Sequence, residues 1–95
     1  MAAYVIGNIE VTNPDLMKEY AGKAGLTIEA HGGKAIVVGG EAEVVEGDWQ
    51  PKRLVVLEFP DMAAATAWYN SPEYQEILPM RLQASNSELV MVEGS

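Results

Sequence analysis

The sequence predicts an α+β domain in which one four-stranded antiparallel sheet carries helices on a single face. Three observations predict it: four stretches alternate apolar residues as strands do, other stretches space them as helices do, and capping or turn residues separate the two kinds. A chain of 95 residues suits one domain, so we expect residues 1–95 to form a single unit.

The first strand and the first helix have clear boundaries. Residues 3–11 direct apolar side chains toward one face at alternate positions, as a half-buried strand does. Asn13 can cap a helix that we expect to run from residue 14 to about residue 30, before Gly32-Gly33 ends it. Four residues at spacings of four form its inner stripe: Leu16, Tyr20, Ala24 and Ile28.

The central segment predicts two strands and a loop. Residues 34–39 form the second strand, which we expect to continue over residues 41–46 after a bulge or bend at Gly39-Gly40. Residues 47–51 form a turn or loop, since glycine, aspartate and proline gather there. Residues 53–59 form the third strand, which is the most strongly apolar.

The last third of the chain predicts a helix, a short second helix and a strand. The helix covers residues 62–70, and a short one follows over residues 71–78, where Pro79 interrupts it. Residues 87–93 form the last strand. The resulting order, β-α-β-β-α-β, is that of the ferredoxin-like fold, which by itself implies no function.

Both faces of the predicted sheet are apolar, although helices cover only one. Leu54 and Val56 alternate with the helix-facing residues of the third strand, and Val90 and Val92 do the same on the last strand. An exposed apolar patch of roughly several hundred Å² is more than a monomer usually tolerates. We therefore expect a homodimer in which sheet packs against sheet about a twofold axis. The alternative is a monomer whose strands are merely rich in valine.

The charge balance and the missing cysteines exclude several classes of function. Fourteen acidic residues outweigh six Lys and Arg, and the net charge of −8 argues against nucleic acid or an anionic membrane as partner. Without cysteine there is no disulfide, thiolate zinc site or cysteine nucleophile, and a single histidine leaves too few ligands for a metal. We expect no metal and no cofactor. No stretch resembles a targeting or membrane-spanning segment, so a cytoplasmic protein is expected.

Four short motifs and one arginine follow one another along the chain. They are His31-Gly32-Gly33-Lys34, Glu46-Gly47-Asp48-Trp49-Gln50-Pro51-Lys52-Arg53, Glu58-Phe59-Pro60 and Ala67-Trp68-Tyr69-Asn70-Ser71-Pro72-Glu73-Tyr74, followed by Arg81. Together they resemble the domain-of-unknown-function 1330 family over nearly the whole chain. The resemblance implies a protomer of the dimeric α/β-barrel superfamily, in which two ferredoxin-like sheets close a barrel. Where many members of that family have Gly-Gly-Arg, this chain has Gly-Gly-Lys with Lys34 in the third position. Lysine keeps the positive charge but lacks the planar guanidinium group that binds a carboxylate through two hydrogen bonds. The family has no established general activity, so no reaction is implied.

Two arginines and one histidine are the first candidates for a functional site. Arg81 and Arg53 are the only arginines of this acidic chain, and a ligand with a carboxylate or enolate needs such a partner. The alternative for each is a structural ion pair with one of the acids. His31 can act as a general base, because histidine titrates near neutral pH. At a helix end it can instead interact with the free carbonyls.

Glu58, Tyr74 and Trp49 complete the candidates. Glu58 interrupts an apolar strand face that should point into a barrel, where a buried carboxylate suits acid–base chemistry. A solvated sheet end or an ion pair is the alternative. Tyr74 is expected to donate a hydrogen bond from its hydroxyl to a ligand, so it joins His31 and Glu58 as a catalytic candidate. Trp49, in the loop, can line a pocket or an interface, and with Arg81 and Arg53 is expected to bind the ligand.

Two functions remain open on these observations. The first is a homodimeric α/β-barrel protein that binds or transforms a small aromatic or carboxylic metabolite without a cofactor, between sheet and helices or inside the barrel. The second is a non-catalytic binding or accessory dimer whose charged residues pair with one another. The fold itself does not decide between an enzyme and a binding protein.

Overall fold

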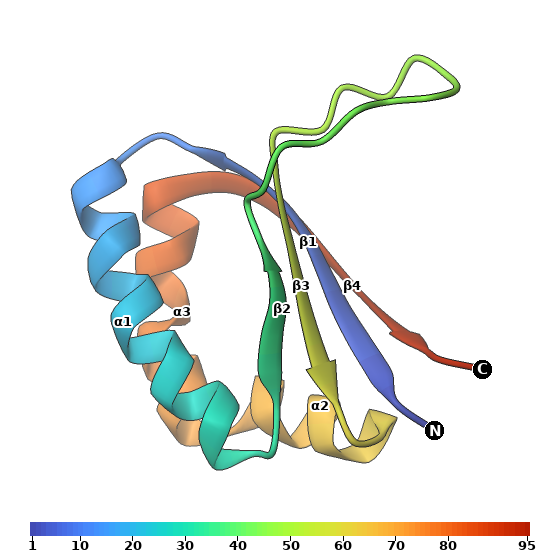
Figure 1. Ribbon diagram of the computed structural model, residues 1–95. Coiled ribbons are helices and arrows are strands. Elements are labelled where there is room, and N and C mark those ends of the chain that lie inside the picture. The colour runs from blue at the N-terminus through green and yellow to red at the C-terminus, as the bar shows by residue number, and fades with distance from the viewer.

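The computed structural model describes residues 1–95 and contains four strands and three helices. In chain order they are β1 (Ala3–Val11), α1 (Pro14–Ala30), β2 (Lys34–Val38), β3 (Arg53–Phe59), α2 (Met62–Asn70), α3 (Pro72–Ala84) and β4 (Ser85–Glu93). The strands form one antiparallel sheet in the order β2-β3-β1-β4, and the helices cover one of its faces (Figure 1). The predicted ferredoxin-like arrangement is confirmed. None of the helices is long and apolar enough to cross a membrane.

The helix-facing side of the sheet builds the core. Val5 on β1 lies between Leu57 on β3 and Met91 on β4. Trp68 from α2 and Tyr74 from α3 are buried against this face, with ring centroids 4.3 Å apart. Burying one large apolar side chain stabilises a fold by roughly 1.5–3 kcal/mol. This aromatic pair therefore holds two helices against the sheet.

The two glycines that follow α1 are needed for different reasons. Gly32 has a φ of +78°, in the left-handed region that glycine adopts without strain at a helix end. Gly33 lies directly on the ring of Phe59, because a Cβ built there would be 2.5 Å from the nearest ring carbon. The pair therefore ends α1 and lets β2 begin over a buried aromatic side chain.

The predicted strand over residues 41–46 is wrong, because this stretch is irregular. β2 ends at Val38, and residues 39–52, which we call the arm, project away from the body (Figure 1). The N–H of Gly39, where φ is +68°, still donates to the Leu54 carbonyl at 2.7 Å. Beyond this point no strand lies alongside to accept and donate hydrogen bonds, which a strand requires. Val45 and Trp49 in the arm are 88% and 57% exposed.

The predicted end of the short helix at Pro79 is also wrong. α3 continues to Ala84, and β4 follows at Ser85 rather than at residue 87. Proline inside a helix removes one hydrogen bond to the carbonyl four residues earlier. Here that carbonyl belongs to Gln75, which is exposed like Pro79 itself, so water can replace the lost donor. The turn beyond the proline is held by the burial of Ala84.

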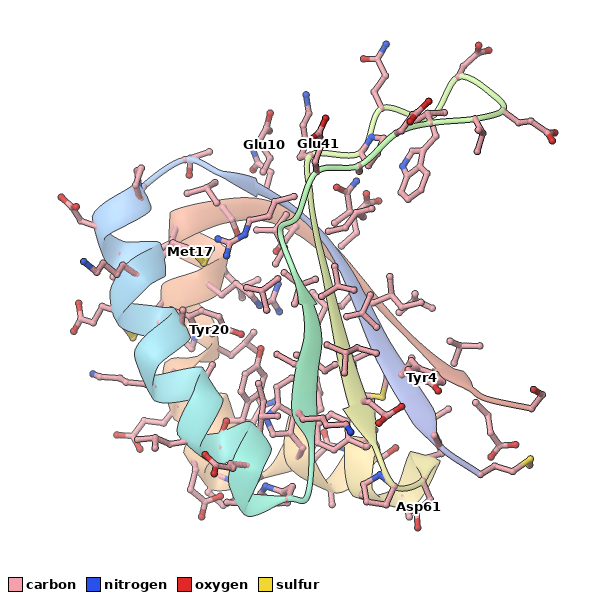
Figure 2. The ribbon with its side chains drawn as sticks, in the orientation of Figure 1. Tyr4, Glu10, Met17, Tyr20, Glu41 and Asp61 are labelled. Atoms are coloured by element: carbon pink, nitrogen blue, oxygen red, sulfur yellow. The ribbon has the colours of Figure 1, made fainter.

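The opposite face of the sheet has no helix over it. Val90 and Val92 on β4 remain exposed there, and Tyr4 lies on the same open side, away from α1 and α3 (Figure 2). Three neighbouring apolar side chains are half-buried: Ile6, Leu54 and Val56. The apolar second face that the sequence predicts is therefore present, and we call it the outer face.

Candidate functional site

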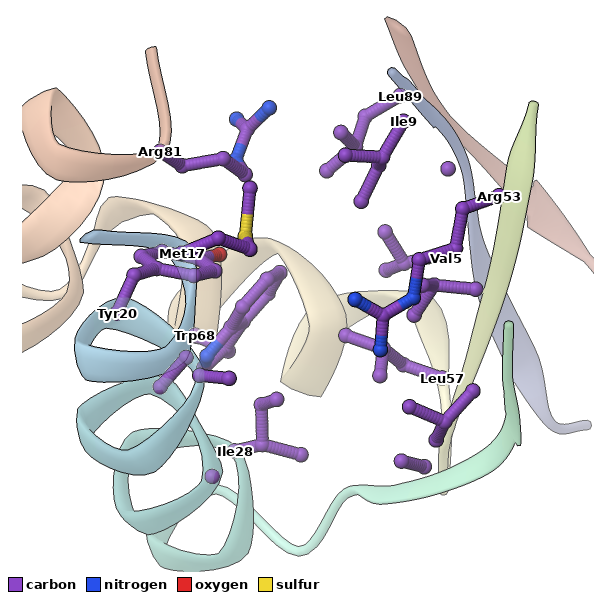
Figure 3. Close-up of a pocket in the computed structure, with 17 residues that line it drawn as sticks. Val5, Ile9, Met17, Tyr20, Ile28, Arg53, Leu57, Trp68, Arg81 and Leu89 are labelled. Carbon is purple, nitrogen blue, oxygen red and sulfur yellow. The ribbon is translucent and has the colours of Figure 1, made fainter. Parts of the chain in front are cut away.

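A cavity of about 160 Å³ lies between α1 and the helix-facing side of the sheet (Figure 3). Small residues on both walls leave this space, among them Gly7 on β1, Ala24 and Gly25 on α1, and Ala35 on β2. The remaining walls are mostly apolar. An engineered apolar cavity of about 150 Å³ holds a benzene molecule. The space here is therefore large enough for one six-membered ring.

Arg81 is the main polar group at this cavity. It projects from α3 and is only 5% exposed, yet no acidic side chain lies within ion-pair distance. Its Nε donates to the Tyr74 hydroxyl at 3.3 Å, and its Nη1 donates to the Ser87 hydroxyl at 2.5 Å. The Nη2 group makes no hydrogen bond within the chain and is not fully enclosed by protein. A buried cation without a counter-charge is costly, which makes this arrangement typical of an anion site.

Two tyrosines extend the polar network from Arg81. The hydroxyls of Tyr20 and Tyr74 are 2.8 Å apart, and Tyr20 lies on the side of α1 that faces the sheet (Figure 2). Either hydroxyl can donate in this bond, and Tyr20 is a wall residue of the cavity. Burial raises the pKa of the Tyr20 phenol, and Tyr74 raises it further, so Tyr20 stays neutral at neutral pH.

Arg53 reaches the same cavity from the sheet. It begins β3, is half-buried, and forms no ion pair or hydrogen bond through its side chain. Gly39 lies against it, because a Cβ on Gly39 would be 2.5 Å from the Arg53 Nε. Figure 3 shows Arg53 and Arg81 entering the cavity from opposite sides, one from the sheet and one from the helices.

The sequence-predicted residues fall into two groups in the structure. Arg81, Tyr74 and Arg53 gather at the cavity, Tyr74 through its bond to Arg81. His31 caps the end of α1, where its Nδ1 is 3.0 Å from the Thr27 carbonyl oxygen, and it does not line the cavity.

The other two predicted residues lie farther from the cavity. Glu58 is on the outer face, where it forms an ion pair with Lys34 at 3.3 Å. Trp49 is in the exposed part of the arm. All of these roles stay predictions: the catalytic ones of His31, Glu58 and Tyr74, and the binding ones of Arg81, Arg53 and Trp49. No group of three or more histidine and carboxylate side chains comes together as metal ligands would.

Ser87 was not predicted, although it fixes one nitrogen of Arg81. Its position carries a signal: it alternates with Leu89 and Met91 on the face of β4 that is directed toward the helices. A hydroxyl beside apolar side chains on a buried strand face needs a partner, which here is the guanidinium.

The model of a family described as "Domain of unknown function (DUF1330)" matches residues 2–95. A crystal structure of a protein of unknown function from Rhodopseudomonas palustris has 21% sequence identity and a TM-score of 0.74, over 99% of this chain and 82% of that one. No match was found among curated proteins.

Two further structures share the fold. One is SnoaB, a cofactor-independent oxygenase from Streptomyces nogalater, with 10% identity, a TM-score of 0.69, and coverage of 99% of this chain and 93% of SnoaB. The other is a dimeric ferredoxin-like protein of unknown function from Jannaschia sp. CCS1, with 16% identity, a TM-score of 0.65, and coverage of 99% and 100%. At these identities the likeness establishes a common fold.

Proposed function

The chain belongs to the DUF1330 family, and from this premise we propose that it is a homodimer that binds a small organic acid with an apolar ring in the cavity between α1 and the sheet. The observation that carries the proposal is Arg81, a buried guanidinium without an acidic partner.

The charge of Arg81 favours an anionic ligand. Moving a charged group out of water costs several kcal/mol unless an opposite charge compensates it. A carboxylate that enters the cavity supplies that charge and can accept from Nη2, the one nitrogen of the guanidinium without a partner in the chain. Guanidinium and carboxylate fit each other geometrically, so the contact also orients the ligand.

The remaining walls favour a ring on that acid. Apolar side chains dominate the lining, and the volume of about 160 Å³ suits one aromatic or alicyclic ring. The Tyr20 hydroxyl can donate a second hydrogen bond to a carbonyl or carboxylate oxygen. An aromatic or alicyclic carboxylic acid meets all of these requirements.

Binding is the function that this cavity supports best, and catalysis is the second candidate. Both arginines and the Tyr20 phenol line the cavity, whereas His31 and Glu58 do not. The Tyr20 hydroxyl can donate a hydrogen bond to a ligand, but a phenol with a raised pKa does not remove a proton at neutral pH. SnoaB, which shares the fold, is a cofactor-independent oxygenase, and this favours testing a bound acid for turnover with oxygen.

The binding experiment compares benzoate with benzyl alcohol, its neutral counterpart, by isothermal titration calorimetry and thermal unfolding. We expect benzoate to bind and to raise the unfolding temperature, and Arg81→Met to weaken benzoate binding at least tenfold. Lys23→Met, which removes an exposed cation of the Lys23–Glu19 ion pair, should leave binding unchanged. Equal binding of benzyl alcohol, or equal benzoate binding by Arg81→Met, contradicts the proposal. Arg81→Gln, which removes the charge but keeps a polar side chain, repeats the test if the methionine variant does not fold.

The homodimer is proposed from the outer face. The Jannaschia protein of the same fold is described as dimeric, and a second copy packed sheet against sheet covers the apolar side chains that no helix covers. Val90→Lys places a charge in that interface and should convert a particle of twice 10.3 kDa into a monomer in light scattering. Leu26→Lys is the matched control, because Leu26 is 71% exposed on α1, away from the outer face. Retention of the dimer by Val90→Lys contradicts a sheet-to-sheet interface.

A further inference from the structure

We infer that the ligand carries two acidic groups, one for each arginine of the cavity. This inference rests on the proposed function and goes beyond it, because a single carboxylate on Arg81 would satisfy that proposal. Its basis is the second guanidinium, that of Arg53, at the opposite wall.

Three of the four lysines of the chain form ion pairs, whereas neither arginine does. The three ion pairs of the protein all use lysines: Lys23–Glu19, Lys34–Glu58 and Lys52–Glu10. The two arginines use none of the fourteen acidic residues, although the chain has more than twice as many acids as bases. Both arginines instead line the same apolar cavity. Because both guanidinium groups lack a counter-charge within this acidic chain, the negative charge that pairs with them comes from a bound ligand.

The position of Arg53 is built into the local structure. Gly39 follows β2 with a φ of +68°, and the Arg53 side chain lies where a side chain of residue 39 would be. The hydrogen bond from the Gly39 N–H to the Leu54 carbonyl, 2.7 Å long, holds this part of the chain against β3. The base of the arm therefore packs on Arg53 and directs it toward the cavity rather than along the sheet (Figure 3).

The positions of the two arginines define the chemical class of the ligand. They enter from opposite sides of a space that holds one ring, so the acidic groups must lie on opposite sides of a compact apolar spacer. A monoacid leaves one half-buried guanidinium without a counter-charge, whereas a ring dicarboxylic acid pairs both. The class is therefore a dicarboxylic acid in which a single ring separates the carboxylates.

The experiment measures the affinities of benzoate, isophthalate and terephthalate by isothermal titration calorimetry at one pH and one salt concentration. We expect the better of the two diacids to bind at least tenfold more tightly than benzoate. Arg53→Gln should reduce the affinity for that diacid to within about twofold of the affinity of the same variant for benzoate, because the diacid loses its second counter-charge and benzoate does not. Lys52→Gln is the matched control, because it removes the neighbouring cation, which pairs with Glu10 and does not line the cavity. We expect it to change neither affinity.

The outcomes separate this inference from the proposed function. The inference is overturned if the diacids bind no more tightly than benzoate, or if Arg53→Gln lowers the affinity for both kinds of ligand by the same factor. In either case, benzoate binding that depends on Arg81 still supports the proposed function. Absence of binding by all three acids overturns both. Because Arg53 is half-buried at the start of a strand, its glutamine variant should fold, and thermal unfolding without ligand checks this.

Discussion

Removal of the Tyr74 hydroxyl should destabilise the protein more than removal of the Tyr20 hydroxyl, although the two groups bond to each other. Tyr74→Phe deletes the oxygen that accepts from Arg81 Nε at 3.3 Å and that contacts Tyr20 at 2.8 Å. Tyr20→Phe deletes only the second contact. The comparison therefore isolates the bond to the buried guanidinium.

The expected magnitudes follow from the two kinds of bond. A bond between neutral groups contributes about 0.5–1.5 kcal/mol, and one that involves a charged group about 1.5–3 kcal/mol. At 3.3 Å the bond to Arg81 is long, so its lower limit applies, and the gap between the variants should be about 1.5 kcal/mol. For a domain of this size that gap corresponds to about 6 to 12 °C in the unfolding temperature.

Urea unfolding of both variants provides the measurement, at one protomer concentration because dimer stability depends on concentration. Equal slopes of free energy against urea show that the two variants unfold the same surface. If Tyr20→Phe is as destabilising as Tyr74→Phe, the bond from Arg81 to the Tyr74 oxygen adds no stability, and the reasoning that Tyr74 holds the buried guanidinium is refuted.

Three further predictions concern other parts of the chain. Gly22→Ala should raise stability by about 0.5–1 kcal/mol, because its Cβ meets no atom within 4 Å on α1, whereas Gly33→Ala should lower the unfolding temperature by pressing on Phe59. Above about pH 10, the free energy of unfolding should fall less in Tyr20→Phe than in the native protein. Folding raises the pKa of Tyr20, so the contribution of its neutral phenol to stability is complete below the pKa of the unfolded state and is lost as pH rises above that value. Unfolding measured as a function of pH tests this. Acrylamide should quench Trp49 and spare the buried Trp68, so Trp49→Phe should remove the quenchable fluorescence; quenching that persists in this variant contradicts the assignment.

The sequence predicts most elements of the fold because their signals are local. Alternation marks β1 and β3, and Asn13 and Asp61 cap α1 and α2 through bonds to Leu16 N at 3.2 Å and Ala64 N at 2.8 Å. The two errors concern features that depend on distant neighbours. The alternating pattern of residues 41–46 cannot reveal that no strand lies beside it, and the penalty at Pro79 does not reveal that the next turn is buried.

The candidate site is predictable in part for a similar reason. Arg81 and Arg53 stand out because arginine is rare in this acidic chain, and both reach the cavity. The chemistry of His31 does not reveal where its ring points, which depends on the last turn of α1. The cavity itself is the sum of small residues on elements far apart in the chain, among them Gly7 and Ala24. No local pattern encodes such a sum.

The separation of charge between surface and cavity has a kinetic consequence. An anion that approaches the protein meets the field of a molecule with a net charge of −8 before it reaches either guanidinium. This repulsion acts over long range, so salt at about 0.1 M, which screens exposed charges beyond about 10 Å, should weaken it. The contact with a buried guanidinium is screened much less. Association of an acidic ligand should therefore accelerate as salt is added, whereas its dissociation rate changes little, the reverse of the behaviour of proteins that attract their ligands from a distance.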